Sequence, residues 1–140
     1  MSHSSPIHTC SVEMKVPFHD ADPMQVVWHG HYVKYFEIAR DELFARNGVN
    51  LLEYWHAAQI LFPIVKLSVK YVLPIQFGMK FACHATLKEA SRKIVFDFEV
   101  MASGEKRIFT KGTTEQIAVK YPEMESLLAI PADIREKLGF

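Results

Sequence analysis

Apolar and polar residues alternate along five stretches of the chain, the pattern of strands that bury one face. In the second stretch, apolar residues from Val65 to Tyr71 alternate with lysine and serine, and the pattern ends before Pro74. Pro17 falls near the end of the first stretch, so that strand is expected to end there or to lie at a sheet edge. The five expected strands cover residues 12–18, 65–71, 79–87, 94–100 and about 107–121.

Between the first two strands the apolar spacing changes to that of a helix. Apolar residues recur at this spacing from Tyr32 to Leu43, and Asn47-Gly48 is a usual helix end. Ile38 and Phe44 are apolar but lie outside the main apolar stripe. Most of the circumference of this helix is therefore expected to be buried, as it would be inside a curved sheet. Shorter helices are expected over residues 50–56 and 131–139.

The order of these elements is one strand, one long helix and then four strands joined by short turns. This order predicts an α+β domain with a mainly antiparallel sheet on one central helix. The open edges of such a sheet favour pairing with a second copy of the chain. Residues 1–10 are polar and are expected to be flexible, so we expect a single domain over residues 11–140.

Composition and charge exclude several classes of partner. The chain has 140 residues with 16 basic and 16 acidic side chains, and this balance gives no field that would attract nucleic acid. No apolar run is long enough to span a membrane, and the N-terminal residues lack the features of a secretion signal. We therefore expect a cytoplasmic protein in which Cys10 and Cys83 are reduced thiols.

The turn between the first strand and the long helix carries the candidate chemistry. Asp20 and Asp22 lie two residues apart, shortly before a helix start whose free N–H groups can hold an oxyanion. A carboxylate at such a place can attack a carbonyl carbon or take a proton from an attacking water. The alternative, which composition alone favours, is that both aspartates are turn and cap residues.

Histidines in the same turn suggest a second kind of site. His19, His29 and His31, with the two aspartates, supply enough donors for zinc or manganese. Side chains two residues apart near a helix start point in roughly opposite directions, so we expect no metal site. Trp28 and Tyr32 could line an apolar ligand wall, although such aromatic residues more often form the core.

The run FHDADPMQVVWHGHYVKYFEIAR resembles the signature of the hotdog-fold acyl-CoA thioesterases of the 4-hydroxybenzoyl-CoA thioesterase and YbgC-like group. The resemblance implies a five-stranded antiparallel sheet wrapped around the long helix. It also implies a homodimer with joined sheets, often a homotetramer, with active sites at the subunit interface. The family's catalytic aspartate falls on Asp22, and the N–H that polarises the thioester carbonyl falls on His29, whose ring is also functional in YbgC-like members.

Two positions depart from the family pattern. Many relatives have glycine where Gln25 stands, so either the chain follows a different path here or the Gln25 amide helps to hold the attacking water. YbgC-like members commonly have tyrosine where Phe18 stands, so no phenol hydroxyl acts at this position. With Trp28 and Tyr32, Gln25 completes the expected substrate-binding residues.

The resemblance implies hydrolysis of acyl thioesters of coenzyme A or of an acyl carrier protein, with no metal or organic cofactor. A first alternative is a hotdog dehydratase or isomerase acting on the same thioesters, because a fold does not fix a reaction. A second alternative is a non-catalytic module that binds acyl-CoA or docks a carrier protein.

Overall fold

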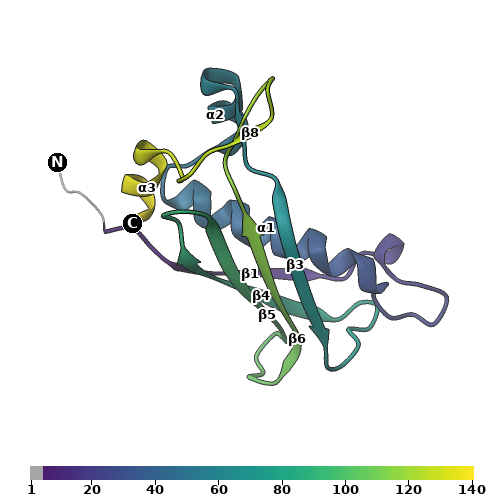
Figure 1. The fold of residues 1–140 in the computed structure, drawn as a ribbon. Helices are drawn as coiled ribbons and strands as arrows, with labels where there is room; N and C mark the ends of the chain where they lie inside the picture. The colour runs from purple at the N-terminus through teal and green to yellow at the C-terminus, as the bar shows by residue number, and fades with distance from the viewer. Residues whose placement is uncertain (1–4) are drawn as a thin grey trace.

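A computed structural model describes residues 5–140 (Figure 1). The first four residues of the segment 1–10, expected to be flexible, lie outside the described residues, and its last two begin the first strand. Two 3-10 turns, Phe18–Asp20 and His29–His31, flank the loop before α1. The elements are β1 (Thr9–Lys15), α1 (Tyr32–Arg46), α2 (Leu51–Ala58), β2 (Ile60–Leu61), β3 (Ile64–Tyr71), β4 (Lys80–Glu89), β5 (Ile94–Ala102), β6 (Ile108–Gln116), β7 (Val119–Lys120), β8 (Glu125–Ser126) and α3 (Ala132–Leu138).

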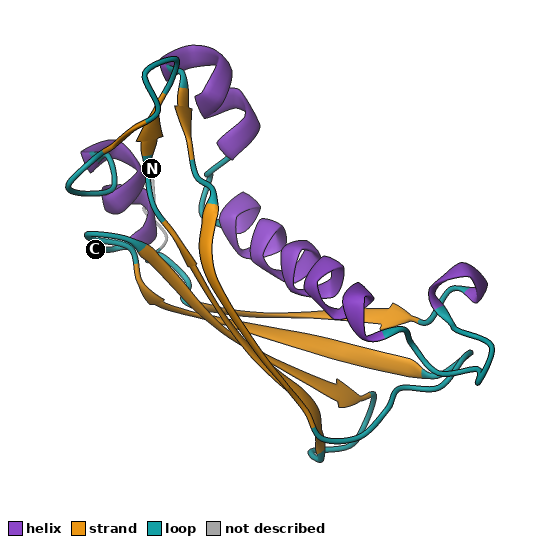
Figure 2. Ribbon diagram, turned by 45° about the vertical axis from the view of Figure 1, so that its right-hand side comes forward, coloured by secondary structure: helices purple, strands orange, loops and turns teal. Residues whose placement is uncertain are grey.

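The main sheet has five strands in the order β1-β4-β5-β6-β3, and every neighbouring pair is antiparallel. Its strands curve around α1, as Figure 2 shows. The α+β class and the five-stranded antiparallel sheet around one long helix are thus confirmed. A second sheet, β2-β7-β8, was not predicted, because strands of two residues are too short to show alternation.

The core lies between α1 and the concave face of the sheet. Phe36 of α1 stacks on Phe98 of β5 with ring centroids 4.7 Å apart, and both side chains are buried. Gly112 of β6 lies directly against the Phe36 ring, where an added Cβ would come within 2.3 Å of a ring carbon. The close approach of helix and sheet at this point therefore depends on the missing side chain.

Two details of the predicted pattern are wrong. Phe18 was expected on the buried face of the first strand, but that strand ends at Lys15 and the Phe18 side chain is 82% exposed. The chain turns after Pro17 into a 3-10 turn, which carries Phe18 away from the sheet. Ile38 was expected to be covered, yet it is 42% exposed, because the curved sheet reaches only one side of α1.

The apolar face of β3 is also largely open. Val65, Leu67 and Tyr71 alternate as predicted, but each is about half exposed. The reason is the position of α1, which packs mainly over β1 and β4, at the opposite edge of the sheet from β3. The described chain therefore leaves the apolar side of one edge strand without cover.

Replacing Gly112 by alanine should lower the free energy of unfolding by about 1–3 kcal/mol, because the new methyl group overpacks the Phe36 ring. Chemical denaturation of Gly112→Ala measures this loss. Combining it with Phe36→Leu should cost less than the sum of the two single changes, since the smaller side chain makes room for the methyl group. A fully stable Gly112→Ala protein would contradict the close packing.

Candidate active site

The loop from Asp20 to Trp28 folds as a tight turn in front of α1. The backbone carbonyl of Asp22 accepts a hydrogen bond from the N–H of Gln25 at 2.8 Å, and the N–H of Asp22 donates to the carbonyl of Val26 at 2.9 Å. Gln25 takes a φ of 63°, in the left-handed region that glycine enters most easily. The departure from glycine at this position therefore needs no different backbone path, only the strain of about 1 kcal/mol that a side chain adds there.

Asp20 anchors this loop to the helix. Its side chain is fully buried, and both carboxylate oxygens accept from Lys34 Nζ at 2.6 Å. Tyr35 Oη donates to Oδ2 at 2.7 Å. Burial by itself would raise the pKa of Asp20, but the hydrogen bonds from Lys34 and Tyr35 outweigh it and hold the pKa below its usual range. Burial, together with the hydrogen bond to Asp20, raises the pKa of Tyr35. Asp20 is therefore a charged structural anchor and not a free acid or base.

Asp22 instead faces an open cavity of about 280 Å³. One carboxylate oxygen, Oδ1, accepts from the N–H of Met24 at 2.8 Å, which fixes the side chain on its own turn. Within residues 5–140, no donor pairs with Oδ2, so this oxygen is available to a substrate or a water. The cavity is lined by Asp22, Val26, Val27, His29, Tyr32, Tyr71, Val72, Leu73 and Pro74.

His29 begins the 3-10 turn that leads into α1 and stands beside the same cavity. Its carbonyl accepts from Tyr71 Oη at 2.8 Å, which ties the helix start to the end of β3. The N–H of His29 donates to no acceptor in the described part of the chain, as expected at a helix start. Asp22 and a residue with an unpaired N–H therefore line one cavity, an arrangement suited to attack on a carbonyl group.

Of the three expected substrate-binding residues, only one lines the cavity. Tyr32 is buried and lines the cavity, and its hydroxyl accepts from the N–H of Ile75 at 3.3 Å. Trp28 is half exposed and covers Gly30, where an added Cβ would come within 2.1 Å of the indole. Neither Trp28 nor the exposed Gln25 lines the cavity, so the structure brings together Asp22, His29 and Tyr32 only.

Tyr71 is the cavity residue that the sequence did not reveal. Its ring lies 5.2 Å from that of Tyr32 and 6.2 Å from that of His29. In the sequence it reads only as the last apolar position of a strand, and 42 residues separate it from His29. No spacing rule covers such a distance, so only the folded sheet could place it here.

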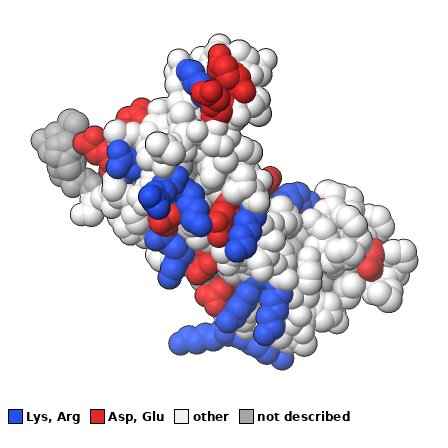
Figure 3. Space-filling model, viewed as in Figure 1, with Lys and Arg blue, Asp and Glu red and all other residues white. Residues whose placement is uncertain are grey.

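Other kinds of site are less well supported. Within residues 5–140, no three histidine, cysteine, aspartate or glutamate side chains form a group that could hold a metal ion. His19 and His31 each approach Asp20, at 3.6 and 3.8 Å, but Lys34 already occupies that carboxylate. None of the described helices has both the length and the apolar character needed to cross a bilayer. On the face that Figure 3 shows, the end of the molecule around this loop carries few charged side chains.

The fold and site define an α+β protein of the hotdog class, with a carboxylate beside the start of its central helix. The chain belongs to the thioesterase-like superfamily, whose family model matches residues 16–138. A protein of Aquifex aeolicus named "Putative esterase" is 28% identical over 126 residues, covering 89% of this chain and 93% of that protein. A Bacillus subtilis protein named "Putative acyl-CoA thioesterase YneP" is 25% identical and covers 81% of each chain.

Solved structures agree with this fold. The 1,4-dihydroxy-2-naphthoyl-CoA thioesterase from Synechocystis superposes with a TM-score of 0.86 at 17% identity, covering 94% of this chain and 96% of its own. The 4-hydroxybenzoyl-CoA thioesterase from Pseudomonas gives a TM-score of 0.80 at 19% identity, covering 94% and 99%. At these identities the likeness establishes the hotdog fold alone.

Removing the buried carboxylate in Asp20→Asn should destabilise the protein at pH 7 by about 1.5–3 kcal/mol, the range for hydrogen bonds to a charged group. Because folding lowers the pKa of Asp20, its contribution is present above the unfolded value near 3.9 and is lost as pH falls through the lower folded value. The free energy of unfolding, measured by urea denaturation from pH 7 to pH 2, should therefore fall less steeply with acid for Asp20→Asn than for the wild type. Glu13→Gln, at an exposed position on β1, is the control, and equal acid slopes for Asp20→Asn and wild type would contradict the anchor.

Proposed function

We propose that the protein hydrolyses acyl thioesters of coenzyme A, with Asp22 as the catalytic carboxylate. The observation that carries this proposal is that Asp22 and His29 line one cavity, while the Oδ2 of Asp22 and the N–H of His29 have no partner among residues 5–140. The thioester carbonyl oxygen accepts from that N–H, which stabilises the negative charge of the tetrahedral intermediate. The names of the related proteins support the same reaction class.

The carboxylate can act in two ways. As a nucleophile, Asp22 attacks the carbonyl carbon, the thiolate leaves, and water then hydrolyses the resulting anhydride. As a general base, Asp22 takes a proton from a water that attacks the same carbon, and the thiolate leaves. Both routes end in a free acid and a thiol, and neither needs a metal or an organic cofactor. The His29 ring, which lines the cavity, orients the substrate or the water.

The open face of β3 supports a homodimer. In the described chain β3 pairs with β6 on one side only, and its apolar face is half exposed. Leu67, near the middle of β3, is an exposed apolar residue. A two-fold axis beside Leu67 pairs β3 with its own copy, joins the two sheets and covers this side chain. Because Tyr71 of β3 lines the Asp22 cavity, the same pairing places the active site at the subunit interface.

The two cysteines and the proposed substrate support a cytoplasmic location. Cys10 and Cys83 are both free and buried, which suits the reducing cytoplasm, where coenzyme A esters are formed. An acyl carrier protein is the second candidate donor of the acyl group, and a homotetramer is the second candidate assembly.

Changing Asp22 to asparagine tests the chemistry. The amide oxygen can still accept from the N–H of Met24, so folding should be unaffected. Removal of the nucleophile or base should lower kcat by about a thousandfold or more, measured as thiol release from a panel of acyl-CoA esters and one acyl carrier protein. Asp97→Asn, which makes the same change away from the cavity, is the matched control.

Three results would overturn the assignment. Near-normal thiol release by a folded Asp22→Asn protein would remove Asp22 from catalysis. Thermal stabilisation of the wild type by acyl-CoA without any thiol release would instead indicate a binding module. Conversion of an acyl-CoA without release of its thiol would indicate a dehydratase or isomerase.

The dimer has its own test. Leu67→Glu should yield monomers, because it places a charge on the apolar face of β3 at the proposed two-fold axis. Light scattering coupled to size-exclusion chromatography measures the mass. Ser68→Glu adds the same charge to the next residue, on the other face of the strand, and should remain dimeric. If Leu67→Glu stays dimeric, the interface lies elsewhere.

A further inference from the structure

The end of the molecule beside the Asp22 loop exposes three large apolar side chains. Phe18 is 82% exposed, Met24 78% and Phe77 46%. The rings of Phe18 and Phe77 pack edge to face, with centroids 5.7 Å apart. The N–H of Phe77 donates to the carbonyl of Gln25 at 2.8 Å, which places Phe77 next to the turn that carries Met24. Phe18, Met24 and Phe77 together are called the apolar tip below.

The two chain segments that form the tip carry almost no charge. Residues 16–33 and 71–79 contain no lysine, arginine or glutamate, and their only aspartates are Asp20 and Asp22. Asp20 is buried against Lys34, and Asp22 lines the cavity. On the face that Figure 3 shows, the right-hand end of the molecule is accordingly almost white. Single exposed apolar residues are ordinary, but a cluster of them without charges indicates a surface that contacts another apolar body.

Two lysines stand where these segments join the main sheet. Lys15 directly precedes residues 16–33, Lys80 directly follows residues 71–79, and the two lie opposite each other in the register of β1 and β4. Both are exposed, and neither forms an ion pair in the described part of the chain. Like charges directly opposite one another repel across a sheet. An anion beside Lys15 and Lys80 would therefore be attracted by both and would relieve their repulsion.

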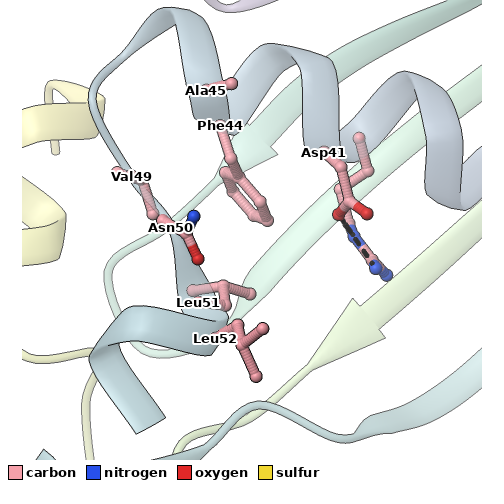
Figure 4. Close-up of a pocket in the computed structure, with 8 residues that line it drawn as sticks. Asp41, Phe44, Ala45, Val49, Asn50, Leu51 and Leu52 are labelled. Atoms are coloured by element: carbon pink, nitrogen blue, oxygen red, sulfur yellow. Dashed lines mark hydrogen bonds and ion pairs between the residues drawn. The ribbon is translucent and has the colours of Figure 1, made fainter. Parts of the chain in front are cut away.

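An exposed apolar residue at the other end of α1 has different surroundings. Leu52 of α2 is 66% exposed and borders a cavity of about 450 Å³ between α1 and α2. Figure 4 shows Leu52 beside Leu51 and Phe44, with Asp41 on the other side of the cavity. Of the charged residues that line this cavity, Asp41 has an exposed side chain and Arg40 is nearly buried. The lining therefore offers no exposed cation beside Leu52, in contrast to the apolar tip.

The proposed dimer leaves the apolar tip uncovered. Phe18 follows β1 and Phe77 precedes β4, and these two strands lie at the sheet edge opposite to β3. Pairing of β3 with its own copy joins the sheets along the other edge. The contact that covers the tip is therefore a different one.

A lipid bilayer suits the tip better than a folded protein. A protein interface brings about one hydrogen bond per 100–200 Å², and the three side chains of the tip offer no strong donor or acceptor for such bonds. Acyl chains need no hydrogen bonds, and anionic headgroups supply the negative charge that Lys15 and Lys80 attract. Apolar side chains beside lysines are thus complementary to an anionic membrane surface.

We propose that the apolar tip inserts into the surface of an anionic lipid bilayer, with Lys15 and Lys80 against the lipid headgroups. The binding is peripheral, since none of the described helices can cross a bilayer. Phe18 and Met24 belong to the same loop as Asp22, so docking holds the Asp22 cavity close to the membrane. Acyl thioesters with long chains partition into that membrane, because it buries their apolar surface. The protein would then meet such molecules where they are concentrated.

Co-sedimentation with lipid vesicles measures this binding. The wild type should bind vesicles that contain phosphatidylglycerol at least about tenfold more strongly than vesicles of phosphatidylcholine alone, since each lysine near an anionic surface contributes about fivefold. Phe18→Ser and Phe77→Ser should each weaken binding to the anionic vesicles by about tenfold. Lys15→Gln combined with Lys80→Gln should remove most of the preference for phosphatidylglycerol. Leu52→Ser removes an exposed apolar side chain at the other end of α1 and should bind as the wild type does.

The two tryptophans report which end of the molecule meets the membrane. Trp28 lies in the segment 16–33 and is half exposed, whereas Trp55 lies in α2 and packs on Tyr121. Lipids with brominated chains quench the fluorescence of a tryptophan that reaches them. In Trp55→Phe the remaining Trp28 should be quenched by anionic brominated vesicles, and in Trp28→Phe the remaining Trp55 should not. The opposite pattern would place α2 at the membrane and would overturn the role of the tip.

Other partners of the tip would give other results. If the wild type does not bind anionic vesicles, or if folded Phe18→Ser and Phe77→Ser proteins bind them as strongly as the wild type, the proposal is wrong. A lower mass of these variants in light scattering would make the tip a contact between copies of the chain and would overturn membrane docking. Loss of binding to an acidic carrier protein, with no vesicle binding by the wild type, would assign the tip to a protein partner instead.

The vesicle measurements contain no acyl thioester, so they are independent of the proposed reaction. A wild type that binds anionic vesicles through the tip but releases no thiol from any substrate would support membrane docking and overturn the proposed function. A wild type that releases thiol but does not bind vesicles would do the reverse.

Discussion

The buried ion pair between Asp20 and Lys34 is the constraint on which the candidate site depends. A fully buried carboxylate is tolerated only because a lysine and the Tyr35 hydroxyl satisfy it, and both partners come from the first turns of α1. The loop before the helix is therefore fastened to the helix that follows it. Asp22 lies two residues further on, so the anchored loop holds it in a fixed position beside the helix start. A loop without this anchor could not hold it there.

The curved sheet adds the other wall of the site. Tyr71, at the end of β3, donates to the carbonyl of His29 and so joins the edge strand to the helix start. The strand that makes this contact is also the one whose apolar face is left open, because α1 lies over the opposite edge. One strand thus serves both the cavity and the proposed interface. Catalytic competence and dimerisation are for this reason expected to be lost together.

The sequence by itself determined the fold class and the limits of the long helix, and its resemblance to a family made Asp22 and His29 the candidates for catalysis. Alternation, helical spacing and a short motif are local patterns, so they can be read along the chain. The tertiary structure decided that Tyr71 lines the cavity, that Trp28 and Gln25 do not, and that the apolar face of β3 is uncovered. These facts depend on contacts between residues far apart in the chain and on how far one helix reaches across a sheet, and no local pattern encodes either.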